Sequence, residues 1–295
     1  MKRISYERIK SRYGYVFISL WLIGMVVFFL IPFIQSVIYS FSSMEIQPGN
    51  VILTFVGWDN YRQAFGGDPE FMPAFTSSLG QVIAQTPLIN IFALFIAIIL
   101  NQKFHGRLLA RSIFFLPVIV SSGVVMNIIN GDANLTTMMT GQRASYMFES
   151  MSIQEILYDM GMNSVLTNYI VTTVNQIFNL SWQSGIQILI YLAGLQSISP
   201  SMYEVAKIDG ATAWETFWKV TFPLIAPMIL VNVVYTMIDV FINYSNPVFK
   251  LIQDTASRTD FAYASAMSII NFLVIFLLIG VVGGLISRRV YYAAD

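Results

Sequence analysis

Few residues in this chain could do chemistry. The sequence contains no cysteine, which excludes disulfides, thiolate metal sites and cysteine nucleophiles. Its one histidine, His105, stands in a basic segment, where we expect it to be solvated. The phosphate-binding pattern G-x-x-x-x-G-K-[S/T] does not occur, so no ATP site of that kind is predicted. We therefore expect no catalytic residue, no metal site and no cofactor bound by this chain.

Two apolar segments carry polar side chains at helical spacing. Asp239 is the only ionisable residue well inside such a segment, and a charge in a membrane is costly and usually functional. Its polar neighbours recur at intervals of three and four, which places them on one helical face: Asn232, Tyr235, Asn243 and Asn246. In the other segment amides recur every four residues beside Trp182: Asn175, Asn179, Gln183 and Gln187.

Such rows suit the binding of a polar solute, because amides and carboxylates form hydrogen bonds with hydroxyl groups and an aromatic ring gives a platform. The sequence predicts that one set lines a substrate path through the membrane: Asn179, Trp182, Gln183, Tyr235, Asp239 and Asn243. The alternative is that the polar groups join helices to one another, as they often do in membranes. The residues alone leave both open.

The composition decides the broad class of protein. Hydrophobic residues make up 56% of the 295 residues, charged residues 11%, and the mean hydropathy is +0.66. Soluble domains carry about 25% charged residues, so this chain cannot build an ordinary water-facing surface. We predict an all-α integral membrane protein. Continuous apolar segments, rather than alternating ones, disfavour a β-barrel.

Six stretches that are almost free of charge are long enough to cross a bilayer as helices. They predict a single transmembrane domain over residues 1–295, with six spans at about 14–40, 77–100, 110–131, 168–195, 224–248 and 263–287. The first apolar run is too long for a signal peptide, so we interpret it as an uncleaved span. Twelve of the 16 Lys and Arg residues fall on one side of these spans, which predicts that both termini are cytoplasmic.

The cytoplasmic loop 196–223 has the clearest local signals. Ser201 to Glu204 and Thr212 to Glu215 fit two capping boxes, and Gly210 suits the left-handed residue that ends a helix. We expect two short helices, one ending at Asp209 and one at Phe222. The loop is too apolar for a solvated linker. An interfacial helix pair and a docking site for a partner protein both fit this pattern.

The segment Glu204-Val-Ala206-Lys-Ile-Asp209-Gly210-Ala211, with Phe217, Pro223 and Pro227 after it, resembles a known signature. It is similar to the cytoplasmic motif of permease subunits of binding-protein-dependent ABC importers, of the carbohydrate-uptake type. Residues 111–117 and 55–61 resemble two further segments of that family. Val205 departs from the family's usual alanine, which a docking surface tolerates.

The resemblance implies a type I importer permease in the bacterial cytoplasmic (inner) membrane. It implies pairing with a second, homologous permease as a heterodimer, on two ATPase subunits that use ATP and Mg. An external solute-binding protein would deliver a sugar or oligosaccharide, and no nucleic acid is involved. Loop 196–223 would couple ATP hydrolysis to transport by alternating access, through Glu204, Ala206, Asp209, Gly210 and Ala211.

Two other classes of membrane protein remain as alternatives. A secondary carrier of a small polar solute would use an ion gradient, and such carriers often show inverted repeats and intramembrane ion ligands. Only Asp239 is of that kind, and no repeat is apparent. An integral membrane transferase would need a catalytic cluster, whereas the acidic residues here are scattered. Copurification with an ATPase would separate the importer from both.

Overall fold

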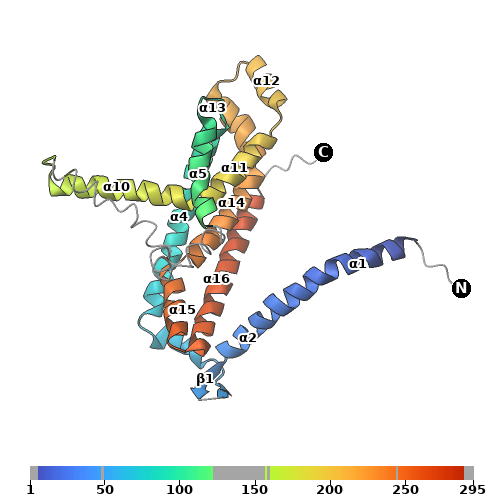
Figure 1. Cartoon of the computed structure of the whole chain (residues 1–295), viewed down its shortest axis with the longest axis vertical. Coiled ribbons are helices and arrows are strands. Elements are labelled where there is room, and N and C mark those ends of the chain that lie inside the picture. The colour runs from blue at the N-terminus through green and yellow to red at the C-terminus, as the bar shows by residue number, and fades with distance from the viewer. Residues whose placement is uncertain (1–5, 48–49, 122–156, 158–159, 244, 289–295) are drawn as a thin grey trace. The chain divides into compact units, whose positions relative to one another are not determined.

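The computed structural model describes residues 6–47, 50–121, 157, 160–243 and 245–288, and most of them are helical (Figure 1). The chain divides into two compact units. The first comprises Met1–Ala74 with Leu251–Val274, and the second comprises Phe75–Lys250 with Ile275–Asp295. Each unit is described by itself below.

The first unit begins with one continuous helical stretch and a hairpin. The helical stretch comprises α1 (Tyr6–Met25), a π-turn η1 (Val26–Leu30) and α2 (Ile31–Ser40). The antiparallel hairpin pairs β1 (Ser42–Gln47) with β2 (Asn50–Phe55). The unit continues with α3 (Asp59–Arg62), the π-turn η2 (Gln63–Gly67) and the start of α4 at Phe71. It is completed by the later part of α15 (Pro247–Ser257) and the first half of α16 (Phe261–Ser287).

Asn60 fastens the end of α2 to the segment that follows the hairpin. Its buried amide nitrogen donates to the main-chain oxygens of Ser40, at 3.0 Å, and Ser42, at 2.9 Å. The hydroxyls of Tyr61 and Ser40 lie 2.8 Å apart. The last carbonyls of a helix have no partner within the helix, so this side chain satisfies one of them. Residues 55–61 therefore anchor the first long helix.

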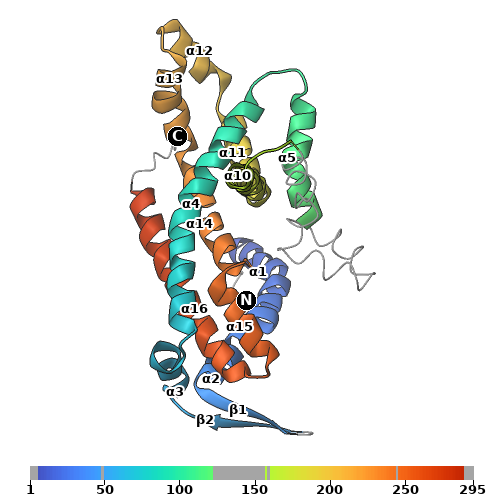
Figure 2. The same ribbon diagram turned by 90° about the vertical axis from the view of Figure 1, so that its left-hand side faces the viewer.

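The second unit packs long helices around two apolar clusters (Figure 2). Its helices are α4 (Phe71–Asn101), α5 (Arg107–Ser121), α10 (Ser164–Gln183), α11 (Gly185–Ser197), α12 (Pro200–Ile208), α13 (Ala213–Thr216), α14 (Phe222–Ile242) and the end of α16. In one cluster Tyr191 and Ile188 of α11 pack with Ala93 of α4. In the other, Ile89 of α4 packs with Phe241 of α14. The core of this unit thus lies between α4, α11 and α14.

Four helices in the described part of the chain are long and apolar enough to cross a membrane. They are Phe17–Ser40, Phe71–Asn101, Ala213–Ile242 and Phe261–Ser287, which agree with four of the six expected spans. The third expected span, 110–131, begins as α5, but residues 122–131 lie outside the described residues, as does most of loop 132–167. The count of six spans and the cytoplasmic position of the termini stay predictions.

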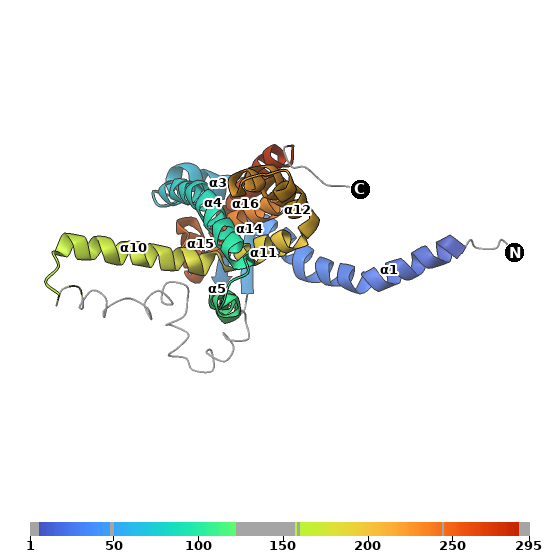
Figure 3. The ribbon, with the colours of Figure 1, turned by 90° about the horizontal axis from the view of Figure 1, so that it is seen from above.

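The span expected at 168–195 is made of two helices in the structure. The chain turns at Ser184, whose φ of −90° and ψ of 1° are not helical, so α10 and α11 are separate helices (Figure 3). A serine followed by Gly185 is a common place for a helix to kink. The side-chain nitrogen of the buried Gln187 faces the carbonyl oxygens of Gln183, at 3.0 Å, and Ser184, at 3.3 Å. The apolar pattern gave no sign of this break, because both halves are uncharged.

Candidate functional site

The predicted coupling loop begins with a helix that starts at Ser199-Pro200, a pair whose sequence also suits a helix start. Ser199 stands at the N-cap position of α12 and Pro200 is its first residue, because the proline ring holds the backbone in a helical φ and the amide it lacks is not needed there. Ser201 therefore lies inside the first turn, and its hydroxyl lies 2.8 Å from that of Ser199. The expected capping box from Ser201 to Glu204 is wrong.

Gly210 ends α12 as expected. Its φ of 71° lies in the left-handed region, which glycine adopts without steric cost. The Gly210 amide donates to the Lys207 carbonyl at 3.1 Å, and the Ala211 amide donates to the Ala206 carbonyl at 2.9 Å. This pair of bonds is the Schellman arrangement, which satisfies the last carbonyls of a helix. The turn between the two helices of the loop is thus held by backbone hydrogen bonds.

The second capping box is confirmed. The Glu215 amide donates to the Thr212 hydroxyl at 3.3 Å, and the Thr212 amide donates to the Glu215 carboxylate at 3.0 Å. In this loop, predicted to lie in the cytoplasm, the hydrogen bonds from Thr212, aided by Lys219, lower the pKa of the Glu215 carboxyl below its ordinary value. The turn therefore starts α13 at Ala213.

The helix that begins at Ala213 does not end at Phe222, so that expectation is wrong. It continues through the π-turn η3 (Phe217–Thr221) into α14 and reaches Ile242. The Phe222 amide donates to the Phe217 carbonyl, which closes the wider turn just before Pro223. The part of loop 196–223 that follows the Gly210 turn and the fifth apolar helix are thus one continuous helical rod, from Ala213 to Ile242.

The five predicted coupling residues occupy different environments. Ala206 is buried, with 8% of its surface exposed, whereas Glu204 and Asp209 are exposed. Ala211 is half-buried and lines a cavity of about 440 Å³ behind α12, beside Tyr203 and Leu195. The turn geometry depends on Gly210, and neither Glu204 nor Asp209 makes a side-chain hydrogen bond or ion pair with another described residue.

The outer face of α12 is apolar and open. Met202, Val205 and Ile208 follow one another at intervals of three and expose 44%, 56% and 84% of their surfaces. Isolated exposed apolar side chains are ordinary, but a row of three on a short helix forms a continuous surface. Such a surface can pack against an apolar groove of another protein.

Several polar residues of the expected spans join helices to one another. The Tyr191 hydroxyl donates to the Asn90 amide oxygen at 2.8 Å, and the Asn90 amide nitrogen donates to the Thr236 hydroxyl at 3.2 Å. The Asn232 amide nitrogen donates to the Gln187 carbonyl at 3.1 Å. All five side chains are buried. For Asn232 and Gln187, the interpretation as contacts between helices is the one that the geometry supports.

The six predicted substrate-path residues do not form one cluster. Asn179 is exposed on α10, and Trp182 and Gln183 follow it, both half-buried. Tyr235 and Asp239 are half-buried and one turn apart on α14. The Asn243 amide oxygen accepts from the Ser245 amide, at 3.0 Å, and hydroxyl, at 2.8 Å, so it closes the turn after α14.

Asp239 has no cation beside it in the described part of the chain. The ion pairs there join Arg62 to Asp59 and Lys219 to Glu215, and neither includes Asp239. A carboxylate in an apolar helix without a cation is costly unless water or a partner solvates it. Its half-buried position is compatible with a path lining.

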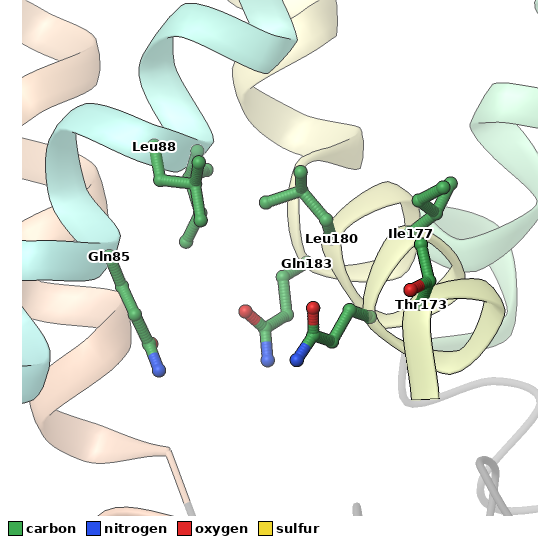
Figure 4. Close-up of a pocket in the computed structure, with 8 residues that line it drawn as sticks. Gln85, Leu88, Thr173, Ile177, Leu180 and Gln183 are labelled. Carbon is green, nitrogen blue, oxygen red and sulfur yellow. The ribbon is translucent and has the colours of Figure 1, made fainter. Parts of the chain in front are cut away.

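A cavity of about 420 Å³ opens between α4 and α10. Figure 4 shows the carboxamides of Gln85 and Gln183 extending into it from the two helices. Gln176 and Thr173 add polar groups, and the remaining wall is apolar: Leu88, Ile89, Ile177 and Leu180. Of the predicted path residues, only Gln183 lines this cavity.

Sequence reasoning missed Gln85, Gln176 and Thr173. Gln176 and Gln183 are seven residues apart, which places them on one face two turns apart, so this spacing was a usable signal. Gln85 lies in the long apolar stretch 77–100, where a single amide forms no pattern. Only the tertiary structure, which sets the two helices on opposite sides of one cavity, brings it near the other two.

Residues 89–295 match the family described as the binding-protein-dependent transport system inner membrane component. The match covers more than half of the chain, including the coupling loop and the helices on both sides of it. The chain belongs to this family. It is therefore an inner-membrane permease component of a transport system that depends on a binding protein, and the resemblance carried by loop 196–223 is confirmed.

Individual relatives of this permease are subunits of ABC transporters. It is 32% identical over 250 residues to the probable ABC transporter permease protein YesP of Bacillus subtilis, covering 83% of this chain and 75% of that protein. It is 31% identical over 225 residues to the multiple sugar-binding transport system permease protein MsmF of Streptococcus mutans, covering 76% and 72%. The names of these relatives describe permeases, in agreement with a chain that is not itself an enzyme.

The fold of the permease also has a solved counterpart. A chain of a bacterial ABC transporter involved in the import of the acidic polysaccharide alginate matches with a TM-score of 0.64 over 97% of this permease and 99% of that chain. The two are 21% identical, so the likeness supports the fold of a type I importer permease and nothing about the substrate.

Proposed function

We propose that this permease moves a sugar or oligosaccharide across the cytoplasmic membrane as one half of a heterodimer with a second, homologous permease. The observation that carries the proposal is the exposed apolar row of α12, which a short turn joins to the helical rod that begins with α13 and continues into α14. That combination suits a helix that a partner protein outside the membrane binds and displaces. Relatives named for sugar transport, such as MsmF of Streptococcus mutans, favour a saccharide as cargo.

In this proposal α12 sits in a groove on one of two ATPase subunits. ATP and Mg are used by those subunits, and this chain contributes the apolar contact through Met202, Val205 and Ile208. The Schellman turn at Gly210 and the cap at Thr212 keep α12 at a set angle to α13. Closure of the ATPases then moves α12 and α14 together, which favours alternating access over a local change in the loop.

The cargo reaches the permease from an external solute-binding protein and passes near the half-buried polar groups of the spans. Gln183 and Asp239 are the residues that we assign to this path. Gln183 lines the amide-rich cavity, and Asp239 has no cation beside it among the described residues. The positive-inside pattern supports a cytoplasmic position for both termini and for loop 196–223, on the side where ATPase subunits would bind.

The proposal is tested by reconstituting the permease with the proteins that copurify with it and measuring ATP hydrolysis in proteoliposomes. We expect hydrolysis to rise when the binding protein is added with a saccharide from a panel, and copurification of the ATPase to be lost in Gly210→Pro. Gly280→Ala is the matched control, because a Cβ at that glycine meets no atom within 4 Å. Sugar transport by the purified chain alone, without an ATPase, would contradict the proposal and favour a carrier.

A further inference from the structure

The cavity between α4 and α10 has a chemistry that restricts its ligand. Its polar groups are the carboxamides of Gln85, Gln176 and Gln183 and the hydroxyl of Thr173. The rest of its wall is apolar, and no charged side chain lines it among the described residues. A carboxamide donates and accepts at once, so three of them can pair with hydroxyl groups of either hydrogen-bonding sense.

The helices around the cavity cannot neutralise an anion. Neither α4 nor α10 contains a lysine, arginine or histidine, and the same holds for α11 and α14. The neighbouring α5 contains Arg107 and Arg111, but neither lines the cavity, and Arg111 donates to the Leu100 carbonyl. Moving a carboxylate from water into an apolar site without a cation carries a large desolvation cost. Hydroxyl groups carry a much smaller cost, which the amides offset. Leu88 and Ile177 expose 56% and 54% of their surfaces in the single chain, so this difference in solvation would favour uncharged over acidic sugars once a partner or lipid shields the cavity from water.

The position of the amides also suits a ring-shaped ligand. Gln85 enters from α4 and Gln183 from α10 (Figure 4). Gln176, which also lines the cavity, lies two turns before Gln183 on the same face of α10. A sugar ring has hydroxyl groups around its edge and apolar C–H faces. Its edge can meet amides on both helices while its faces lie against apolar walls such as Leu88 and Ile177.

We infer that this cavity is a binding subsite for an uncharged saccharide ring, held by Gln85, Gln176 and Gln183. The inference rests on the proposed function and adds to it the class of sugar. It separates this permease from its solved counterpart of the same fold, which belongs to an importer of an acidic polysaccharide. We do not expect this permease to share the counterpart's acidic cargo, because no described residue that lines the cavity is positively charged.

The absence of cysteine from the chain allows a direct test in the assembled permease and ATPase complex. Ile177→Cys places one thiol on the apolar wall without removing an amide, and Val174→Cys places one on the same helix outside the cavity. Both complexes are inserted in nanodiscs without binding protein and labelled with N-ethylmaleimide. Mass spectrometry of this chain measures the rate of labelling by N-ethylmaleimide in the presence of millimolar oligosaccharides. The neutral ones are glucose or arabinose oligosaccharides, and the acidic ones are oligogalacturonate or oligomannuronate of equal length.

We expect neutral oligosaccharides to slow labelling several-fold in the Ile177→Cys variant, whereas acidic oligosaccharides leave its labelling rate unchanged. Neither kind of sugar should change the labelling rate of the Val174→Cys variant. Gln85→Leu should abolish the protection, and Gln81→Leu, one turn away on α4 and outside the cavity, should keep it. Equal or better protection by the acidic sugars would overturn the inference and leave sugar transport standing. Uptake of the same sugars is measured in parallel in proteoliposomes with binding protein, and import of a sugar that gives no protection would remove the cavity from the path. If no sugar is imported or protects, the proposed function itself fails.

Discussion

The hydroxyl of Tyr191 lies 2.8 Å from the amide oxygen of Asn90, although 101 residues separate them in the sequence. The bond ties α11, which leads into the coupling loop, to α4. Asn90 also reaches Thr236 on α14, the helix that leaves the loop. The helices on both sides of the loop are thus joined to the same third helix by buried polar groups.

Breaking this network should destabilise the permease. Asn90→Leu removes the hydrogen bonds of the Asn90 side chain with Tyr191 and with Thr236. It leaves the buried Tyr191 hydroxyl without its acceptor. Hydrogen bonds between membrane helices contribute on average about 0.6 and at most about 1.7 kcal/mol, so we expect a loss of roughly 1 to 2 kcal/mol. Thermal unfolding in detergent measures it. Tyr169→Phe, on the exposed surface of α10, is the control. A melting temperature unchanged in Asn90→Leu would mean that the network does not stabilise the fold.

Gly194 permits the close approach of α11 and α14. A Cβ at this position would lie 2.6 Å from the Met228 Cγ, so Gly194→Ala forces the helices apart or the methionine to move. Overpacking of this kind costs about 1 to 3 kcal/mol. We expect a lower melting temperature and lower uptake, both restored when Met228→Ala is added. A single mutant that is as stable as the native permease would show that the contact is not limiting.

Gly210 should be sensitive to any Cβ. A residue other than glycine at a φ of 71° costs roughly 1 to 2 kcal/mol, and asparagine tolerates the conformation better than most. We expect Gly210→Val to uncouple ATP hydrolysis from uptake and Gly210→Asn to retain part of the coupling. The ratio of sugar imported to ATP hydrolysed in proteoliposomes measures this. The idea fails if the two variants couple equally well.

Asp239 and Trp182 test the substrate path. Asp239→Ala and Trp182→Ala should each cut sugar uptake while assembly with the second permease and the ATPases survives, since both residues lie away from α12. Uptake assays and copurification give the two readouts. Asp239→Asn separates the need for a charge from the need for a polar group. Normal uptake in both alanine variants would leave these residues as contacts between helices.

Sequence patterns alone predicted what depends on neighbouring residues. Apolar runs located four spans, the box from Thr212 to Glu215 located the start of α13, and Gly210 located the end of α12. Each of these signals acts over a few residues, because hydrogen bonds and backbone sterics of one helical turn decide it. The resemblance in residues 204–211 named the family that the comparison later confirmed.

Tertiary packing decided the roles of the polar residues. Asn232 and Asp239 look alike in a helical pattern, yet Asn232 binds the α11 backbone and Asp239 stays half-buried without a cation among the described residues. Gln85 gained a place in a cavity only because α10 packs beside α4. The sequence by itself determined the membrane class, the family, and the turn and the second cap of loop 196–223. The amide-lined cavity depends on contacts between distant segments, which no local pattern encodes. The break at Ser184 and the single rod from Ala213 to Ile242 are local in origin, but uncharged apolar sequence does not reveal where a helix breaks or continues.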